Sequence, residues 1–275
     1  MRKIPLRRLV VERSIFTDEK EALGWIMAGK VYVNGSPVTK AGLGVDPEAE
    51  LRVRGLHLPY VSRGGLKLAG AIASFGLTVR DVVAMDAGAS TGGFTDCLLQ
   101  HGARLVYAVD TGHGQLAGRL RVDPRVVNME RTNIGDAALA ELDPKPTAAT
   151  VDLSYLSLKK AVPTVAGLLG GPKTMVALVK PLFEVADAEA RRTGIVRERS
   201  VYAAVLRDLA DSLSQADLRV RGICHSPITG NRGTREFFIL LSSDADLPLR
   251  PSREDLLVQI ERSVEAAADL KPYGK

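Results

Sequence analysis

The stretch of sequence that decides the fold is a glycine-rich segment, Asp86-Ala87-Gly88-Ala89-Ser90-Thr91-Gly92-Gly93-Phe94-Thr95. It follows an apolar run at residues 82–85 that predicts a strand, and a helix is expected to begin near Gly93. Glycines let the backbone turn tightly and approach a ligand, and a helix N-terminus offers free N–H groups. The segment matches neither GxGxxG nor GxxxxGK[ST], which argues against a phosphate cradle. We therefore expect a ligand-binding turn between a strand and a helix.

Strand-like and helix-like runs alternate through the chain from about Val82 onward. Beyond residues 82–85, strands are predicted at residues 104–109, 126–129, 148–151, 175–179, 218–223 and 237–241. Most of these are separated by stretches long enough for a helix, such as residues 158–169 and 199–215. Parallel strands need crossovers of this length, so the pattern predicts a doubly wound α/β sheet. A last amphipathic helix is expected from Ser252, as a packing element.

The first 58 residues follow a different pattern. Residues 19–28 have the apolar spacing of a helix, with Asp18 placed to cap its start and Gly29 to follow its end. A short strand then reaches the turn dipeptide Asn34-Gly35, and residues 51–54 alternate like a second strand. We expect a small module of two short helices and a few strands, joined to the sheet by residues 59–65.

Composition excludes several classes of protein. The chain has 275 residues, 45% hydrophobic and 25% charged, with a net charge of +5 and a pI near 9.2, which is typical of a globular protein and permits an anionic partner. Its two cysteines, Cys97 and Cys224, form no CxxC, so we expect no disulfide framework and no metal site. Neither a signal peptide nor a membrane span is recognised, and a cytoplasmic location is expected.

The glycine-rich segment has the spacing D-x-G-x-S-x-G-G, which is typical of the cofactor loop of class I methyltransferases, with Asp86 facing an amino-acid-like ligand. Asp110 ends the next predicted strand, 24 residues further on, where an acidic side chain would bind ribose hydroxyls. Asn133 follows the third strand, where an amide could meet an adenine ring. An ordinary turn asparagine is an equally good explanation of Asn133, and a glycine-rich turn without a ligand is the alternative for the loop.

Four polar residues make a candidate catalytic set: Lys67, Asp152, Lys180 and Glu236. Asp152 and Lys180 each end an apolar run, and ligands of open α/β sheets lie beyond the carboxyl ends of the strands. Pro181 would stop the strand directly after Lys180. A hydroxyl becomes a nucleophile when a base takes its proton, and a lysine serves as that base if burial or a neighbouring cation lowers its pKa. Taken singly, each residue is more often a solvated surface charge.

These residues resemble the TlyA (hemolysin A) family of ribosomal RNA ribose 2′-O-methyltransferases. The motifs that carry the resemblance are Pro59 to Leu68, Asp86 to Thr95, Ala108-Val109-Asp110, Asp123 to Val126, Glu130 to Asn133, Leu178 to Pro181 and, in the N-terminal module, Ile26 to Gly35. The resemblance implies an S4-like RNA-binding domain of α+β class over residues 1–58. It implies an FtsJ-like domain over residues 59–275, with a seven-stranded, Rossmann-like class I methyltransferase sheet.

The resemblance also implies a function: S-adenosylmethionine-dependent 2′-O-methylation of cytidine in ribosomal RNA. Lys67, Asp152, Lys180 and Glu236 match the family's K-D-K-E tetrad, with Lys180 as the hydroxyl-activating residue and Asp152 positioning it. The implied cofactor-binding residues are Asp86, Gly88, Ser90, Thr91, Gly92, Gly93, Phe94, Asp110, Asn133 and Asp152. The expected RNA contacts are Arg7, Arg8, Arg13, Lys30 and Arg63. Ribosomal RNA or a ribosomal subunit is the expected partner.

Several residues depart from the family pattern. His113 and Gly118 stand where the family has tyrosine and tryptophan, Leu182 replaces a glutamine and Thr234 an asparagine. The first 58 residues carry ten Lys/Arg and seven Asp/Glu, a small excess for an RNA-binding module. An enzyme of the same fold that methylates a different RNA or a small metabolite therefore stays open. A non-catalytic RNA-binding factor and a pore-forming hemolysin are less favoured, because the tetrad is intact and no membrane span is recognised.

Overall fold

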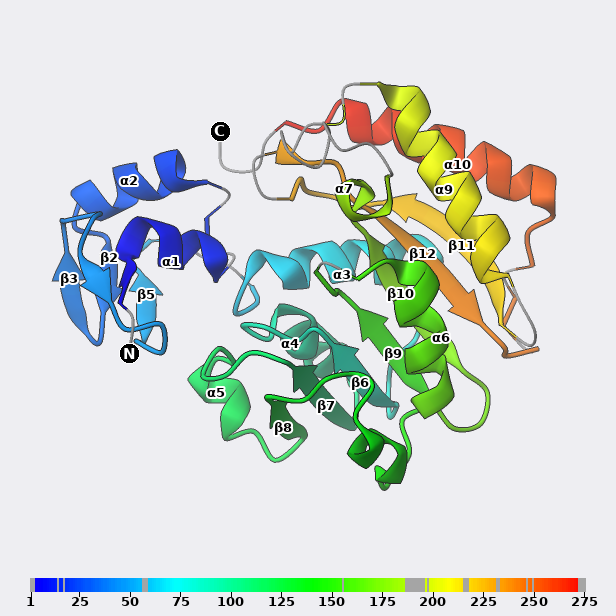
Figure 1. Cartoon of the computed structure of the whole chain (residues 1–275), viewed down its shortest axis with the longest axis horizontal. Coiled ribbons are helices and arrows are strands. Elements are labelled where there is room, and N and C mark those ends of the chain that lie inside the picture. The colour runs from blue at the N-terminus through cyan, green and yellow to red at the C-terminus, as the bar shows by residue number, and fades with distance from the viewer. Residues whose placement is uncertain are drawn as a thin grey trace.

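The computed structural model describes residues 3–13, 15–16, 18–55, 59–154, 156–185, 196, 198–214, 218–230, 233–245, 247–248 and 250–271. Two parts are visible in Figure 1: a small N-terminal domain made of the elements before α3, and a larger α/β domain made of the elements from α3 onward. Among the helices that the structure describes, none combines the length and apolar composition needed to cross a bilayer.

The N-terminal domain packs two short helices against small antiparallel strands. Its elements are β1 (Ile4–Pro5), α1 (Leu6–Glu12), α2 (Glu19–Met27), β2 (Val31–Val33), β3 (Ser36–Val38), β4 (Gly44–Val45) and β5 (Leu51–Val53). The Asp18 carboxylate accepts a hydrogen bond from the Glu21 N–H (2.7 Å) and caps α2, as predicted. Leu6, Phe16 and Ile26 are fully buried in a core of their own. This domain therefore has its own core, separate from that of the sheet.

The α/β domain is built on one seven-stranded sheet. Its strands are β6 (Val83–Ala87), β7 (Leu105–Asp110), β8 (Val126–Glu130), β9 (Ala148–Val151), β10 (Thr174–Val179), β11 (Arg219–His225) and β12 (Phe237–Ser242). Their order is β11-β12-β10-β9-β6-β7-β8. All seven predicted strands are confirmed, with ends that differ from the prediction by two residues at most.

The sheet is parallel except at β12, which runs antiparallel to both β10 and β11. This refines the expectation of a doubly wound sheet. β11 and β12 are separated only by residues 226–236, which is too short for a helical crossover, so the two strands form an antiparallel pair. The start of β12 therefore lies at the same edge of the sheet as the ends of the parallel strands.

Helices cover both faces of the sheet. The helical elements of this domain are α3 (Arg63–Phe75), α4 (Gly93–Gln100), α5 (Gly118–Arg121), the 3₁₀ helix η1 (Ala137–Glu141), α6 (Leu158–Leu168), α7 (Pro181–Glu184), α9 (Arg199–Leu213) and α10 (Arg253–Ala268). One apolar core lies under α6, α9 and α10, and a second lies under α3, α4 and α5. In Figure 1 the sheet accordingly runs between α3 and α4 on one side and α6, α9 and α10 on the other. The expected C-terminal helix is α10, which packs on β11 and α9.

Candidate active site

The glycine-rich segment forms the turn between β6 and α4, as predicted. Gly88 has φ +93°, and a Cβ atom at this position would lie 2.3 Å from the Asp152 carbonyl oxygen. At Gly93, the first residue of α4, a Cβ atom would lie 2.9 Å from the Gly65 backbone nitrogen at the start of α3. Because both positions lack a side chain, the loop lies against the end of β9 and the starts of two helices approach each other closely.

Asp86 lies beneath this turn and is fully buried. Its carboxylate accepts hydrogen bonds from the hydroxyls of Thr95 (2.7 Å) and Thr150 (2.8 Å). Burial raises the pKa of Asp86 to about 6, and the two threonine hydrogen bonds act in the opposite direction. Asp86 was expected to face a ligand. In this structure its carboxylate instead ties β6 to the first turn of α4 and to β9.

The two other residues expected to recognise a nucleoside follow the next strands of the sheet. The Asp110 carboxylate accepts hydrogen bonds from the backbone N–H groups of Ser90 (2.8 Å) and Gly112 (2.6 Å). Asp110 therefore joins the glycine-rich turn to the loop after β7. The Asn133 side-chain oxygen accepts a hydrogen bond from the Gly135 N–H (2.9 Å), which is the geometry of a turn asparagine.

The four candidate catalytic residues form two ion pairs. Lys67 Nζ lies 2.6 Å from Glu236 Oε2, and both side chains are nearly buried. Lys180 Nζ pairs with Asp152 Oδ1, and it lies 3.4 Å from Ser154 Oγ. Glu236 precedes β12, so it reaches this edge of the sheet because β12 is antiparallel. β10 ends at Val179, Lys180 is the N-cap of α7, and Pro181 is the first residue of that helix, so the strand stops just before Pro181, as predicted.

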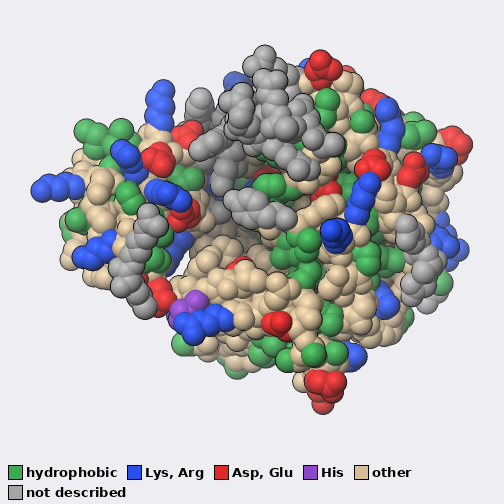
Figure 2. Space-filling view, viewed as in Figure 1, with side chains coloured by type: hydrophobic (Ala, Val, Ile, Leu, Met, Phe, Trp, Pro, Cys, Tyr) green, Lys and Arg blue, Asp and Glu red, His purple; other side chains and the backbone are tan. Residues whose placement is uncertain are grey.

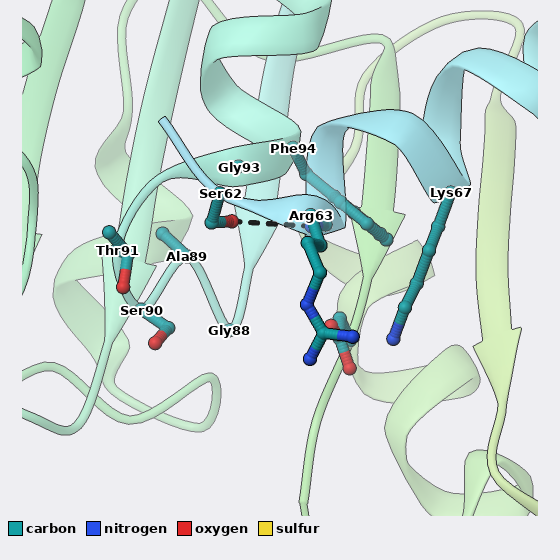
Figure 3. Close-up of a pocket in the computed structure, with 11 residues that line it drawn as sticks. Ser62, Arg63, Lys67, Gly88, Ala89, Ser90, Thr91, Gly93 and Phe94 are labelled. Atoms are coloured by element: carbon teal, nitrogen blue, oxygen red, sulfur yellow. Dashed lines mark hydrogen bonds between the residues drawn. The ribbon is translucent and has the colours of Figure 1, made fainter. Parts of the chain in front are cut away.

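A single pocket joins the glycine-rich turn to the two ion pairs. It is lined by Ser62, Arg63, Gly64, Lys67, Gly88, Ala89, Ser90, Thr91, Gly93, Phe94 and Asp152. Figure 3 shows the turn on one side of this pocket, Lys67 on the other, and the Arg63 side chain extending between them. Lys67 and Asp152 each belong to one ion pair, so the pocket holds one member of both. The structure therefore places the glycine-rich turn beside two lysine–carboxylate pairs at the same edge of the sheet.

Comparison with known proteins identifies the family. The FtsJ-like methyltransferase family matches residues 60–243, and the S4 domain family matches residues 20–51. The 16S/23S rRNA (cytidine-2'-O)-methyltransferase TlyA of Mycobacterium tuberculosis is 36% identical over 87% of this chain and 90% of its own length. Hemolysin A of Brachyspira hyodysenteriae is 37% identical over 77% of this chain and 88% of its own length. The chain belongs to the TlyA/hemolysin A family of FtsJ-like methyltransferases.

A solved structure from Streptococcus thermophilus agrees with this TlyA-family assignment over both domains. It is 40% identical in sequence, superposes with a TM-score of 0.79, and covers 98% of this chain and 96% of its own. The expectations of a Rossmann-like sheet, an N-terminal S4 domain and a methyltransferase are thereby confirmed.

The residues expected to contact RNA fall into two groups in this TlyA-family methyltransferase. Arg7 pairs with Glu19 (2.8 Å) and Arg8 with Glu12 (2.6 Å), both on the surface, while Lys30 lies 4.9 Å from the centre of the Trp25 ring. The Arg13 guanidinium is part-buried and donates to the backbone carbonyls of residues 47 and 49. Arg13 therefore serves the fold of its own domain.

Arg63, the fifth expected RNA contact, is only 2% exposed and lines the pocket. Its guanidinium Nη2 donates to the Phe16 carbonyl of the N-terminal domain (2.9 Å). Thr91 Oγ1, in the glycine-rich turn, donates to the Arg13 carbonyl (3.2 Å). Two residues of the pocket lining therefore donate hydrogen bonds to the N-terminal domain.

Sequence reasoning assigned no role to three residues that the structure brings to the site. Ser62 caps α3, Ser154 contacts Lys180, and Glu184 binds the start of α6. Glu184 stands four residues after Lys180 in the motif Lys180-Pro181-Leu182-Phe183-Glu184, and this motif was the signal in the sequence. The spacing within the motif does not show that Glu184 lies next to the start of α6. Leu182, which departs from the family pattern, is part-buried against the core under α6 and α9.

Proposed function

We propose that this TlyA-family enzyme transfers a methyl group from S-adenosylmethionine to the 2′-hydroxyl of a cytidine in ribosomal RNA. The observation that carries the proposal is the pair of lysine–carboxylate contacts, Lys67 with Glu236 and Lys180 with Asp152, beside the glycine-rich turn. The relatives support the substrate class, since the Mycobacterium tuberculosis relative is named a cytidine-2'-O-methyltransferase of 16S and 23S rRNA.

The glycine-rich turn fits a methyl donor of the proposed kind. The backbone at Gly88 is free of a side chain, and Asp110 holds the turn from the strand end where ribose hydroxyls are recognised in related folds. The residues proposed to hold the donor are Asp86, Gly88, Ser90, Thr91, Gly92, Gly93, Phe94, Asp110, Asn133 and Asp152. Of these, Asp86 would contribute indirectly, because its hydrogen bonds to Thr95 and Thr150 fix the shape of the turn. S-adenosylmethionine supplies an electrophilic methyl group on a positively charged sulfur.

The charged residues would prepare the acceptor hydroxyl. In the proposed reaction the hydroxyl oxygen forms a bond to the methyl carbon and its proton passes to the Lys180 amine, while the electron pair of the broken carbon–sulfur bond stays on sulfur. Asp152 orients Lys180 and stabilises the resulting ammonium. Lys67 and Glu236 would hold the ribose in line with the methyl group.

The N-terminal domain is proposed to bind the RNA backbone, with domain limits at residues 1–58 and 59–275. Figure 2 shows Lys and Arg side chains over the surface of this domain, interspersed with Asp and Glu. Arg7, Arg8 and Lys30 are the proposed contacts, because phosphates would compete with the exposed acidic partners of both arginines. Ribosomal RNA or a ribosomal subunit is the proposed partner, in the cytoplasm.

The test measures transfer of a labelled methyl group to ribosomal subunits from a strain that lacks the endogenous modification. The wild type should place label on a cytidine 2′-oxygen, and Lys180→Ala should lower the transfer rate by two orders of magnitude or more. Lys159→Ala is the matched control, because Lys159 also pairs with an aspartate, Asp208 (2.6 Å), but on the exposed surface of α6. Absence of label in rRNA together with label in a small acceptor would overturn the proposal.

A further inference from the structure

Glu184 connects the two strand ends that carry Lys180 and Asp152. It is the last residue of α7 and lies four residues after Lys180. Its Oε1 accepts a hydrogen bond from the Leu158 N–H (2.8 Å), and its Oε2 accepts one from the Ser157 hydroxyl (2.6 Å). Ser157 and Leu158 form the N-terminus of α6, directly after the segment that begins at Asp152.

These contacts belong to a closed path of hydrogen bonds and chain segments that includes Lys180. Lys180 pairs with Asp152 and lies 3.4 Å from Ser154 Oγ, and both partners belong to the connection between β9 and α6. From Ser154 the chain reaches Ser157, whose hydroxyl binds Glu184, and from Glu184 it returns through α7 to Lys180. Glu184 therefore links α7, which follows Lys180 directly, to the connection that carries both partners of this lysine.

The sheet ladder by itself does not hold the two strand ends together. The paired register of β9 and β10 ends at Val151 opposite Ala177, before either Asp152 or Lys180 is reached. The backbone of Asp152 is hydrogen-bonded to β6, on the side of β9 away from β10, because its N–H donates to the Ala87 carbonyl (2.9 Å). Beyond the end of this paired register, Lys180 contacts the Asp152–Ser154 segment through side chains.

We propose that Glu184 is a positioning residue, which holds the Asp152–Ser154 segment against Lys180 by binding the start of α6. The inference rests on the proposed function, in which Lys180 receives the hydroxyl proton. A lysine with four rotatable bonds holds its amine in one place only when its partners are fixed, so a displaced acceptor segment should slow the reaction without removing a reacting group.

The first experiment follows Lys180 directly in the full-length protein and needs no substrate. Lysines are reductively methylated with ¹³C-formaldehyde, and the Lys180 resonance is assigned by its loss in Lys180→Arg. Glu184→Ala should shift this resonance, and Glu184→Gln should leave it close to its wild-type position, because a glutamine oxygen still accepts from the Leu158 N–H. Glu184→Asp has a side chain one methylene shorter and should shift the Lys180 resonance in the same direction as Glu184→Ala. This variant replaces Glu184→Ala in the experiment if the alanine variant does not fold.

Ser252→Ala is the matched control for this experiment. Ser252 caps α10 in a capping box with Asp255, so its replacement removes a side-chain acceptor from the N-terminus of a helix, as Glu184→Ala does at α6, but outside the pocket lining. Both variants should lower the melting temperature to a similar degree, and only the Glu184 variant should move the Lys180 resonance. An unchanged Lys180 resonance in folded Glu184→Ala or Glu184→Asp would overturn the inference.

Methyl transfer provides the second readout. Glu184→Ala should lower kcat on the order of tenfold with KM for the donor within about twofold, and Glu184→Gln should restore most of kcat. An equal fall of kcat in Ser252→Ala would count against the inference. If the wild type labels no rRNA, the proposed substrate is wrong, and the Lys180 resonance still decides the role of Glu184.

Discussion

At the scale of single residues, a buried carboxyl group dominates the site. Asp86 has no contact with solvent, and its two oxygens receive hydroxyl hydrogen bonds from α4 and β9. Two neutral donors compensate burial only in part, so the pKa of this carboxyl is raised to about 6. The residue that opens the sequence motif is therefore a structural group whose charge depends on pH.

This raised pKa makes the stability of the protein depend on pH in a defined direction. A carboxyl with a pKa near 3.9 in the unfolded chain and about 6 in the folded protein binds more protons when folded, so stability falls as the pH rises from about 4 to about 6. The full effect is at most about 3 kcal/mol, at 1.36 kcal/mol per pKa unit. Asp86→Asn removes this charge and should gain stability relative to the wild type over that interval. Urea denaturation of both proteins from pH 4 to pH 7 measures the difference, and a difference that is constant with pH would contradict the assignment.

At the scale of elements, the site depends on turns that follow strands. The Asp18 cap of α2 and the start of α4 at Gly93 were predictable, because each depends on residues within a few positions of it. The turn at Gly88 depends on a distant element, since the atom that excludes a side chain there is the Asp152 carbonyl oxygen. No pattern in residues 86–95 reveals that β9 lies beside them.

Two glycines separate the effect of backbone conformation from that of close packing. Gly88 and Gly102 have nearly equal φ angles, +93° and +94°, but a Cβ atom at Gly102 would lie 3.5 Å from its nearest neighbour instead of 2.3 Å. Gly102→Ala should cost about 1–2 kcal/mol for the left-handed conformation alone. Gly88→Ala should cost more and should weaken donor binding, because the turn must move away from Asp152. Denaturation and calorimetric titration with S-adenosylmethionine measure both effects, and equal losses in the two variants would contradict the role of close packing.

At the scale of the whole molecule, the N-terminal domain lies against the pocket. Phe16 and Arg13 offer backbone carbonyls to Arg63 and Thr91, and His113 lies 3.4 Å from Glu48 of the same domain. His113 replaces a family tyrosine and stands between Glu48 and Glu130 (3.6 Å), so this departure from the family pattern falls on the contact between the domains. These three contacts connect the N-terminal domain to the residues around the proposed donor site.

Arg63 tests this connection. Arg63→Met leaves the Phe16 carbonyl without this donor, which should destabilise the protein by about 1–3 kcal/mol. The variant should also increase the radius of gyration and weaken S-adenosylmethionine binding, since Arg63 lines the pocket. Small-angle scattering, denaturation and calorimetry measure these changes. Arg8→Met is the control, because Arg8 forms an exposed ion pair within α1, and matching behaviour of the two variants would refute the role of Arg63.

The sequence by itself predicted the seven strands and the capped helix of the S4 domain, and the family resemblance singled out Lys67, Asp152, Lys180 and Glu236 as a candidate catalytic set. Local hydrophobic periodicity and capping depend on near neighbours, and a family motif specifies residues one by one. The tertiary structure alone decided the direction of β12, which brings Glu236 to Lys67, and the burial of Asp86 and Arg63. It also showed that Glu184 faces the start of α6. These features depend on contacts between segments far apart in the chain, which are set by strand order and domain packing and leave no periodic signal in the sequence.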